Sequence, residues 1–225
     1  MAVAISRCVG DGENVGVGEN SPVPTAGVLL ARRLHAPGVR LRLRSANSPV
    51  PGTVPYIGSK EFFDFAQRGK LDLFFLSGVQ IDHHGNLNLH VLGAYGAPSR
   101  RFPGSFGSAV LYPIVKRVIL FRMEHSPRVF VERVDFVTAA GRPDRVITPM
   151  AVLIPNPASG ELELATYHPG QSVDSVRAAT GFKLAVRADV RQTPPPTAEE
   201  LSELRGPVRS ELATVYPAYA AAIGT

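Results

Sequence analysis

The stretch Asn14-Val15-Gly16-Val17-Gly18, with the two segments that follow it, decides the fold. It is typical of a short apolar strand that ends in glycine. A helix is expected over residues 26–35, where apolar residues face a core and Ala36-Pro37-Gly38 ends the run. Residues 39–43 alternate apolar residues with arginine, which favours a strand with one solvent-exposed face. Strand, helix and strand in this order predict a parallel βαβ unit.

The remainder of the chain continues to mix helices and strands. Helices are expected at residues 1–8, 60–68, 108–116 and 173–180. Strands are expected at residues 71–77, 89–92, 118–121, 129–131, 136–138, 146–153, 161–166 and 183–186. The fold class is therefore α/β. We expect one domain over residues 1–190, followed by a stiff proline linker and a helical arm over residues 191–225, whose helix opens at the capping-box pattern Thr197-Ala198-Glu199-Glu200.

The composition limits the classes of function. The 225 residues fit one large domain, and a single cysteine, Cys8, cannot form an internal disulfide, which favours a cytoplasmic protein. The net charge is +5, and nearly all the positive charge is arginine. It could attract an anionic ligand, although most of these arginines are expected to be scattered and solvated, and no nucleic-acid-binding motif accompanies them. No signal peptide is apparent, and no run approaches the ~18 apolar residues of a membrane span.

Four segments could carry chemistry, and three of them are sparse in polar side chains. In Gly16-Val17-Gly18-Glu19-Asn20, glycines at a strand-to-helix junction would let a ligand approach the backbone, and Glu19 could serve as a general base or simply cap the helix. In Gly104-Ser105-Phe106-Gly107, backbone N–H groups could stabilise an oxyanion, or the segment could be only a connector. His168-Pro169-Gly170 holds a lone histidine, which is more often structural than catalytic.

The fourth segment, Gly78 to Asn88, is the densest in polar side chains. Asp82, His83 and His84 invite a metal site, but neighbouring histidines seldom both face one ion, and no cysteine or glutamate in the segment completes a ligand set. Turn stabilisation by Asp, Asn and Gly explains the composition without a ligand. We therefore expect no metal.

These pieces together resemble the β subunit of family I coenzyme A transferases, in particular the glutaconate type, over about residues 16–182. The segment from Gly78 to Asn88 resembles the family's Gly-x-Gln-x-Asp-x-x-Gly-Asn-x-Asn turn closely. The other matching segments are residues 16–38, 130–138, 168–170 and 180–182. The resemblance implies an open, mostly parallel α/β sheet with flanking helices, and a homologous α subunit that completes the active site, as a heterodimer or heterotetramer.

Two departures from the family matter. Its catalytic glutamate, which attacks the acyl-CoA, corresponds to Ala46 in Ser45-Ala46-Asn47-Ser48, and its Gly-Ser-Gly-Gly loop contains Phe106 here. Without the carboxylate the covalent route of transfer is lost, so the resemblance favours hydrolysis, as in the similar steroid ring-cleaving CoA hydrolases. Transfer through another carboxylate, a non-catalytic subunit that braces the α chain, and an unrelated phosphate-binding α/β protein remain alternatives.

The resemblance, combined with the segments above, defines the candidate site. The residues expected to be catalytic are Glu19, Ser45, Asn47 and Gln80. The residues expected to bind the substrate's CoA part are Gly16, Gly18, Gly104, Ser105, Phe106 and Gly107. CoA enters as part of an acyl-CoA substrate, and no separate cofactor, nucleic acid or membrane is expected as a partner.

Overall fold

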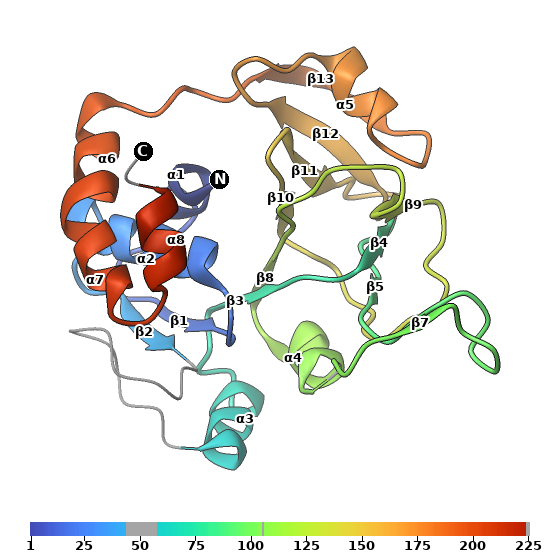
Figure 1. The fold of residues 1–225 in the computed structure, drawn as a ribbon, viewed down its shortest axis with the longest axis horizontal. Coiled ribbons are helices and arrows are strands. Elements are labelled where there is room, and N and C mark those ends of the chain that lie inside the picture. Colours follow the sequence, from blue (N-terminus) through green and yellow to red (C-terminus); the bar gives the residue numbers. More distant parts are fainter. Residues whose placement is uncertain (44–57, 105, 224–225) are drawn as a thin grey trace. The chain divides into compact units, whose positions relative to one another are not determined.

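The computed structural model describes residues 1–43, 58–104 and 106–223 (Figure 1). Its contacts divide the chain into two compact units. Unit 1 comprises Met1–Phe75 and Pro196–Thr225, and unit 2 comprises Leu76–Pro195. Within the described residues, no helix is both long and apolar enough to cross a bilayer.

Unit 1 is built on the predicted βαβ arrangement. Strand β1 (Asn14–Val17) lies between β2 (Arg40–Leu43) and β3 (Leu73–Leu76), and both pairs are parallel. Helix α2 (Pro22–Leu34) connects β1 to β2, and α1 (Ala2–Ser6) packs against it. Helix α3 (Ser59–Gln67) precedes β3. The sequence prediction of this unit is thereby confirmed.

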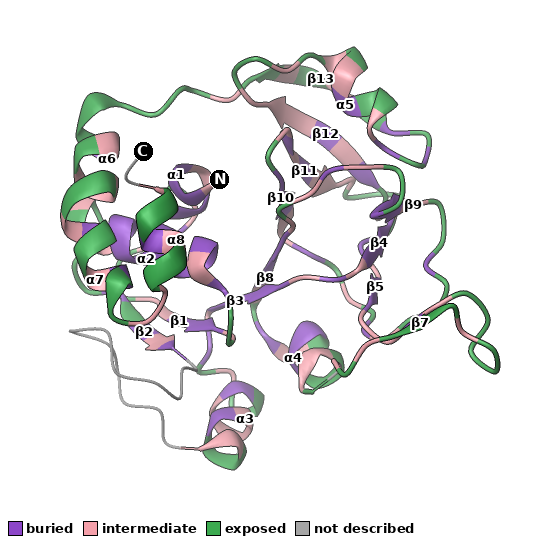
Figure 2. Ribbon diagram, in the orientation of Figure 1, coloured by how far each residue is buried: buried purple, intermediate pink, exposed green. Residues whose placement is uncertain are grey.

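Helix α2 begins four residues earlier than the sequence indicates. Pro22 and Pro24 lie in its first turn, where backbone N–H groups have no intrahelical partner, so the missing proline N–H costs nothing. Every residue from Val23 to Ala31 is buried, which makes α2 the central helix of unit 1 (Figure 2).

The C-terminal arm covers α2. It comprises α6 (Ala198–Glu203), a π-helical turn η1 (Leu204–Val208), α7 (Arg209–Ala213) and α8 (Pro217–Ala222). The capping box is present: Thr197 and Glu200 each accept a hydrogen bond from the other's backbone N–H. Pro207 has no N–H to donate, which explains the loosened turn. Val208 and Leu212 are fully buried.

Unit 2 contains a mixed sheet in the order β8-β10-β11-β12-β13. Its strands are β8 (Arg117–Phe121), β10 (Arg145–Ile147), β11 (Ala151–Pro155), β12 (Leu162–Tyr167) and β13 (Ala185–Gln192). The pairs β8/β10 and β12/β13 are parallel, whereas β11 is antiparallel to both of its neighbours. Helices α4 (Ser108–Ile114) and α5 (Val173–Ala178) complete the described helices of this unit.

Two predicted strands of unit 2 were wrong. The single strand expected over residues 146–153 is a hairpin, because Pro149 lacks a donor and the Thr148 hydroxyl accepts hydrogen bonds from the N–H groups of Met150 and Ala151. Residues 136–138 lie in the described part of the chain and form no strand; only the adjacent Ala139 makes an isolated bridge, to Leu87.

Smaller sheets carry the polar turn. Strands β4 (Gln80–Asp82) and β5 (Leu87–Asn88) are antiparallel, and β9 (Phe130–Val131) pairs with β4 in parallel. Strands β6 (Val91–Leu92) and β7 (Arg100–Arg101) form a separate hairpin. The predicted loop from Gln80 to Asn88 is therefore a tight hairpin whose strands are buried. Over the chain the class is α/β with a mostly parallel sheet and flanking helices, as expected.

Candidate functional site

Two glycines of unit 1, Gly16 in β1 and Gly18 just after it, have different surroundings. A Cβ on Gly16 would lie 2.7 Å from Cδ2 of Phe74 and 3.1 Å from Cζ of Phe62, so packing alone demands glycine there. A Cβ on Gly18 would meet only the Ser21 hydroxyl, at 3.9 Å. Gly18 therefore keeps room for a ligand, whereas Gly16 has a structural reason to be glycine.

Glu19 follows in a turn just before α2. Its backbone carbonyl accepts a hydrogen bond from the hydroxyl of Ser21, the N-cap residue of α2, at 3.1 Å. The Ser21 side chain makes no capping bond to the helix, and Asn20 adopts a left-handed backbone with φ of 52°. Glu19 is thus an exposed residue beside the start of a buried helix.

In unit 2, Gln80 is at the centre of a buried amide network. Its Oε1 accepts from Nδ2 of Asn88 at 2.7 Å and from the backbone N–H of Asp135 at 3.0 Å. Asn88 Nδ2 also donates to the carbonyl of Val91, and its Oδ1 accepts from the N–H of His90. The network joins the β4/β5 hairpin to the segment that carries Asp135. This gives the family-like Gln and Asn a structural role besides the catalytic one predicted for Gln80.

Asp82 holds the turn between β4 and β5. Its Oδ1 accepts from the N–H groups of His84 and Asn86, each at 3.0 Å, and its Oδ2 accepts from Nδ2 of Asn86. Gly85 takes a φ of 82°, and a Cβ on it would lie 2.9 Å from Pro143. Asp82 is therefore a turn-forming residue, as the alternative to a metal site predicts.

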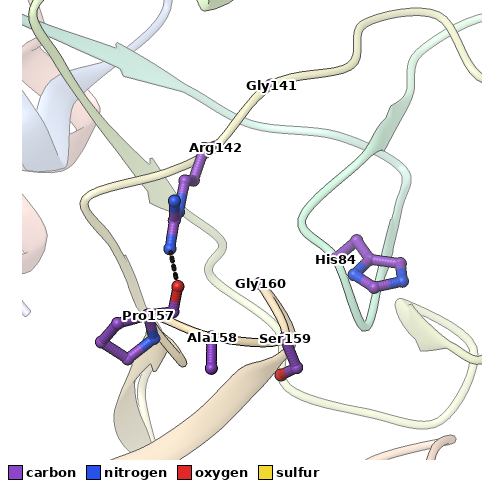
Figure 3. Close-up of a pocket in the computed structure, with 7 residues that line it drawn as sticks. All are labelled: His84, Gly141, Arg142, Pro157, Ala158, Ser159 and Gly160. Carbon is purple, nitrogen blue, oxygen red and sulfur yellow. Dashed lines mark hydrogen bonds between the residues drawn. The ribbon is translucent and has the colours of Figure 1, made fainter.

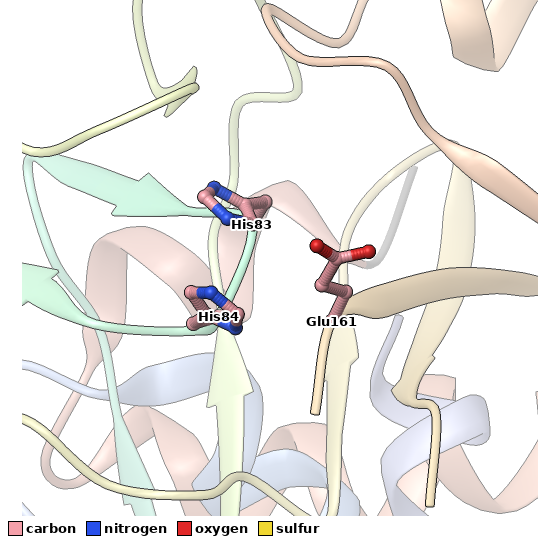
Figure 4. A group of neighbouring side chains, drawn as sticks. All are labelled: His83, His84 and Glu161. Atoms are coloured by element: carbon pink, nitrogen blue, oxygen red, sulfur yellow. The ribbon is translucent and has the colours of Figure 1, made fainter. Parts of the chain in front are cut away.

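The two histidines of this turn lie near Glu161, which comes from the segment just before β12 (Figure 4). One ligand atom from each of His83, His84 and Glu161 lies within 4.8 Å of the other two. His84 also lines an open pocket of about 300 Å³ with Gly141, Arg142 and residues 157–160 (Figure 3). The sequence analysis found no third ligand among the neighbours of these histidines in sequence. The fold brings Glu161, which is distant in sequence, close to both rings.

The loop expected to bind CoA leads into α4. Gly107 caps this helix with a left-handed backbone of φ 73°, a conformation that favours glycine. A Cβ on Gly104 would meet only the Leu89 carbonyl, at 3.9 Å, and the Phe106 side chain is 64% exposed. The described part of this loop is open enough for a ligand to approach its backbone.

Two histidines in unit 2 have a structural role, which the sequence favoured for His168 and did not indicate for His125. His125 is buried between the hydroxyls of Thr148 and Thr180, at 2.8 and 3.0 Å, and burial lowers its pKa to about 4. His168 contacts the Thr193 hydroxyl and the Thr148 carbonyl, and burial lowers its pKa as well. Their threonine partners lie up to 55 residues away in sequence, so no local pattern marks them.

The predicted site residues fall into two described groups. Gly16, Gly18 and Glu19 lie at the end of β1 and just after it in unit 1, whereas Gln80, Gly104, Phe106 and Gly107 lie in unit 2. Ser45, Ala46, Asn47 and Ser105 lie outside the described residues. The roles assigned to all of these residues stay predictions.

Comparison with known proteins bears on the same segments. Residues 45–179 match the model of the coenzyme A transferase family, which is more than half of the chain. The chain belongs to the coenzyme A transferase family. The resemblance inferred from the polar turn and the glycine segments is thereby confirmed.

Members of the family that are similar to this chain carry different activities. The B subunit of the 3-oxoadipate CoA-transferase from Pseudomonas knackmussii is 29% identical over 91% of this chain and 90% of its own length. The cholesterol ring-cleaving hydrolase IpdB subunit of Rhodococcus jostii is 28% identical over 71% of this chain and 67% of its own. The crystal structure of glutaconate coenzyme A-transferase from Acidaminococcus fermentans superposes with a TM-score of 0.79 at 27% identity, over 91% of both chains.

Proposed function

We propose that this chain is the β subunit of an α/β enzyme that hydrolyses a carbon–carbon bond in a CoA-linked ring ketone or diketone. The observation that carries the proposal is Ala46, which stands in Ser45-Ala46-Asn47-Ser48 where the family's catalytic glutamate is expected. A methyl group cannot form the acyl–enzyme intermediate that transfer requires. The similarity to the IpdB hydrolase subunit supports the same choice.

The reaction balances without a covalent enzyme intermediate. Water adds to the ketone carbon while a carboxylate takes its proton. The adjacent carbon–carbon bond then breaks, its electron pair stays on the neighbouring carbon, and that carbon takes the proton back. The thioester remains intact and serves to bind the substrate. Glu19, which the turn of unit 1 leaves exposed, is the candidate carboxylate of this chain, and the α subunit would supply the rest of the site.

The test is an assay of this chain produced together with its α subunit. A CoA thioester with a bulky ring ketone should give a ring-opened acid that still carries CoA and one oxygen atom from ¹⁸O-labelled water. Hydroxylamine should trap no enzyme-bound acyl group. Glu19→Gln should lower kcat by about 10²-fold or more if Glu19 is the base. Activity only on thioesters of short acids, with release of free CoA, would contradict the proposal.

Transfer of CoA between carboxylic acids is the second candidate. The B subunit of the 3-oxoadipate CoA-transferase, similar over nearly the whole chain, favours it. Transfer requires an attacking carboxylate other than residue 46, so it predicts a hydroxylamine-sensitive adduct on the unmodified protein.

Full activity after separate substitution of Glu19, Gln80 and Ser105 would instead favour a bracing subunit without chemistry of its own.

A further inference from the structure

We propose that His83, His84 and Glu161 form a binding site for a divalent transition-metal ion of the zinc class. The three ligand atoms lie within 4.8 Å of one another in unit 2 (Figure 4). Two imidazoles and one carboxylate are a ligand set that suits Zn²⁺, with water in the fourth position. Mg²⁺ and Ca²⁺ prefer oxygen ligands only, so they do not fit the two imidazoles.

The tautomer of His83 is set for metal binding. Its Nδ1 lies 2.6 Å from the backbone carbonyl oxygen of Glu132. A carbonyl can only accept, so Nδ1 carries the proton and Nε2 keeps a free lone pair in the neutral ring. Metal-binding histidines commonly donate their second ring nitrogen to a carbonyl in this way, because the bond orients the ring and raises its basicity.

The backbone holds the third ligand beside the turn. The N–H of Leu162 donates to the carbonyl of His83 at 2.7 Å, which fixes Glu161 next to the histidines. The turn itself is held by the bonds that Asp82 accepts from His84 and Asn86. Two segments separated by almost eighty positions in sequence, 83–84 and 161, are thus anchored to each other through main-chain contacts before any ion binds.

The side chains need only a small adjustment. Ligands of a tetrahedral Zn²⁺ lie about 3.4 Å apart when each is about 2.1 Å from the ion. The distances between the three ligand atoms must therefore shorten by on the order of 1 Å. Rotation of the His84 and Glu161 side chains can achieve this, because both residues are exposed. Arg142 lines the adjoining pocket and donates a hydrogen bond to the carbonyl of Pro157 (Figure 3). It also donates to the carbonyl of Asn156.

Calorimetric titration with ZnCl₂ tests the site. The full-length chain, without a histidine tag and freed of metals with a chelator, should bind one Zn²⁺. Glu161→Gln and His84→Asn should each weaken binding at least tenfold, while MgCl₂ should give no heat of binding. The matched controls are Glu61→Gln and His35→Asn, an exposed glutamate and an exposed histidine of unit 1, and both should bind as the unmodified chain does.

A second measurement reports the ligands directly. Co²⁺ in place of Zn²⁺ should give visible absorption of a four-coordinate ion, and this band should disappear in His84→Asn. Zn²⁺ should also raise the melting temperature of the unmodified chain, and at the same Zn²⁺ concentration it should raise that of Glu161→Gln less. If His84→Asn melts at a lower temperature in EDTA than the unmodified chain, the substitution destabilises the fold. The binding measured with Glu161→Gln then decides whether the metal site exists. No saturable binding, or unchanged binding by Glu161→Gln, would overturn the proposal.

Discussion

Gly16 in β1 and Gly18 just after it stand two residues apart, yet they are glycine for different reasons. The position of Gly16 is filled by the rings of Phe74 and Phe62, whereas that of Gly18 opens to the Ser21 hydroxyl alone. A sequence pattern of two glycines at a strand end cannot separate these cases, because both suit a turn and both suit a ligand.

Gly16→Ala is expected to destabilise the fold. Its Cβ would lie 2.7 Å from the ring of Phe74 in a packed core, and overpacking of this kind costs about 1–3 kcal/mol. Chemical denaturation should show the loss as a lower midpoint. Gly18→Ala is the matched control, expected within about 0.5 kcal/mol of the unmodified protein. If Gly18→Ala nonetheless weakens acyl-CoA binding, the prediction that a ligand approaches Gly18 gains support.

His125 is expected to make the fold sensitive to acid. An unfolded histidine takes a proton near pH 6.5, whereas the buried ring resists it until about pH 4. Acid in this interval therefore stabilises the unfolded state, by about 3 kcal/mol at most. The free energy of unfolding should fall as the pH is lowered from 6.5 to 4, and the slope should flatten in His125→Asn. An unchanged slope in the variant would show that other groups carry the effect; His168, also with a lowered pKa, acts in the same direction.

At the scale of elements, the arm is held to the rest of unit 1 by ion pairs. Arg7 donates two hydrogen bonds to the carboxylate of Glu200, at 2.8 and 2.7 Å, and Arg32 pairs with Glu211 at 2.6 Å. Arg33 pairs with Glu203 as well as with Glu211. The pairs of Arg7 and Arg32 are only partly exposed, so water screens them less than ordinary surface pairs, whereas the Arg33 pairs are exposed.

Arg7→Ala should loosen the arm. The paired guanidinium lowers the pKa of Glu200, and loss of a charged hydrogen-bond partner costs about 1–3 kcal/mol. The contribution is present at neutral pH and is lost as the pH falls below the ordinary pKa of Glu200, near 4.5. Denaturation of Arg7→Ala at pH 7 and pH 4 measures both effects. Arg68→Ala, an exposed arginine after α3, should leave stability nearly unchanged, and an equal loss in both variants would argue against the pair.

At the scale of the whole molecule, the chain returns at its end to the unit in which it began. Residues 196–225 belong to the same compact unit as residues 1–75, although unit 2 lies between them in sequence. Unit 1 is therefore incomplete without the arm, which buries Val208 and Leu212 and packs on α2.

Truncation after Pro195 should destabilise one unit selectively. The arm's face of α2 would become exposed, so amide hydrogens of α2 should exchange faster, while those of β11 and β12 in unit 2 should keep their protection. Hydrogen exchange read by mass spectrometry separates the two units. Equal loss of protection in both would show that they unfold as one.

The sequence by itself determined the class of the fold, the βαβ start, the capping box at Thr197 and the family. Each depends on patterns within a few residues: apolar periodicity, a proline or glycine at an element's end, or the turn from Gly78 to Asn88. The two strand predictions that failed cover residues 136–138 and 146–153, where strand-forming residues occur. An isolated bridge lies beside the first segment, and a turn interrupts the second.

Only the tertiary structure decided which distant residues meet. His125 is buried between Thr148 and Thr180. The side-chain oxygen of Gln80 accepts hydrogen bonds in a buried network. Glu161 lies beside His83 and His84. The physical reason is that side-chain hydrogen bonds and metal ligation depend on distance in space, and strands far apart in sequence become neighbours only when the sheet forms. Local pattern shows which elements form, and packing shows which of their polar groups act together.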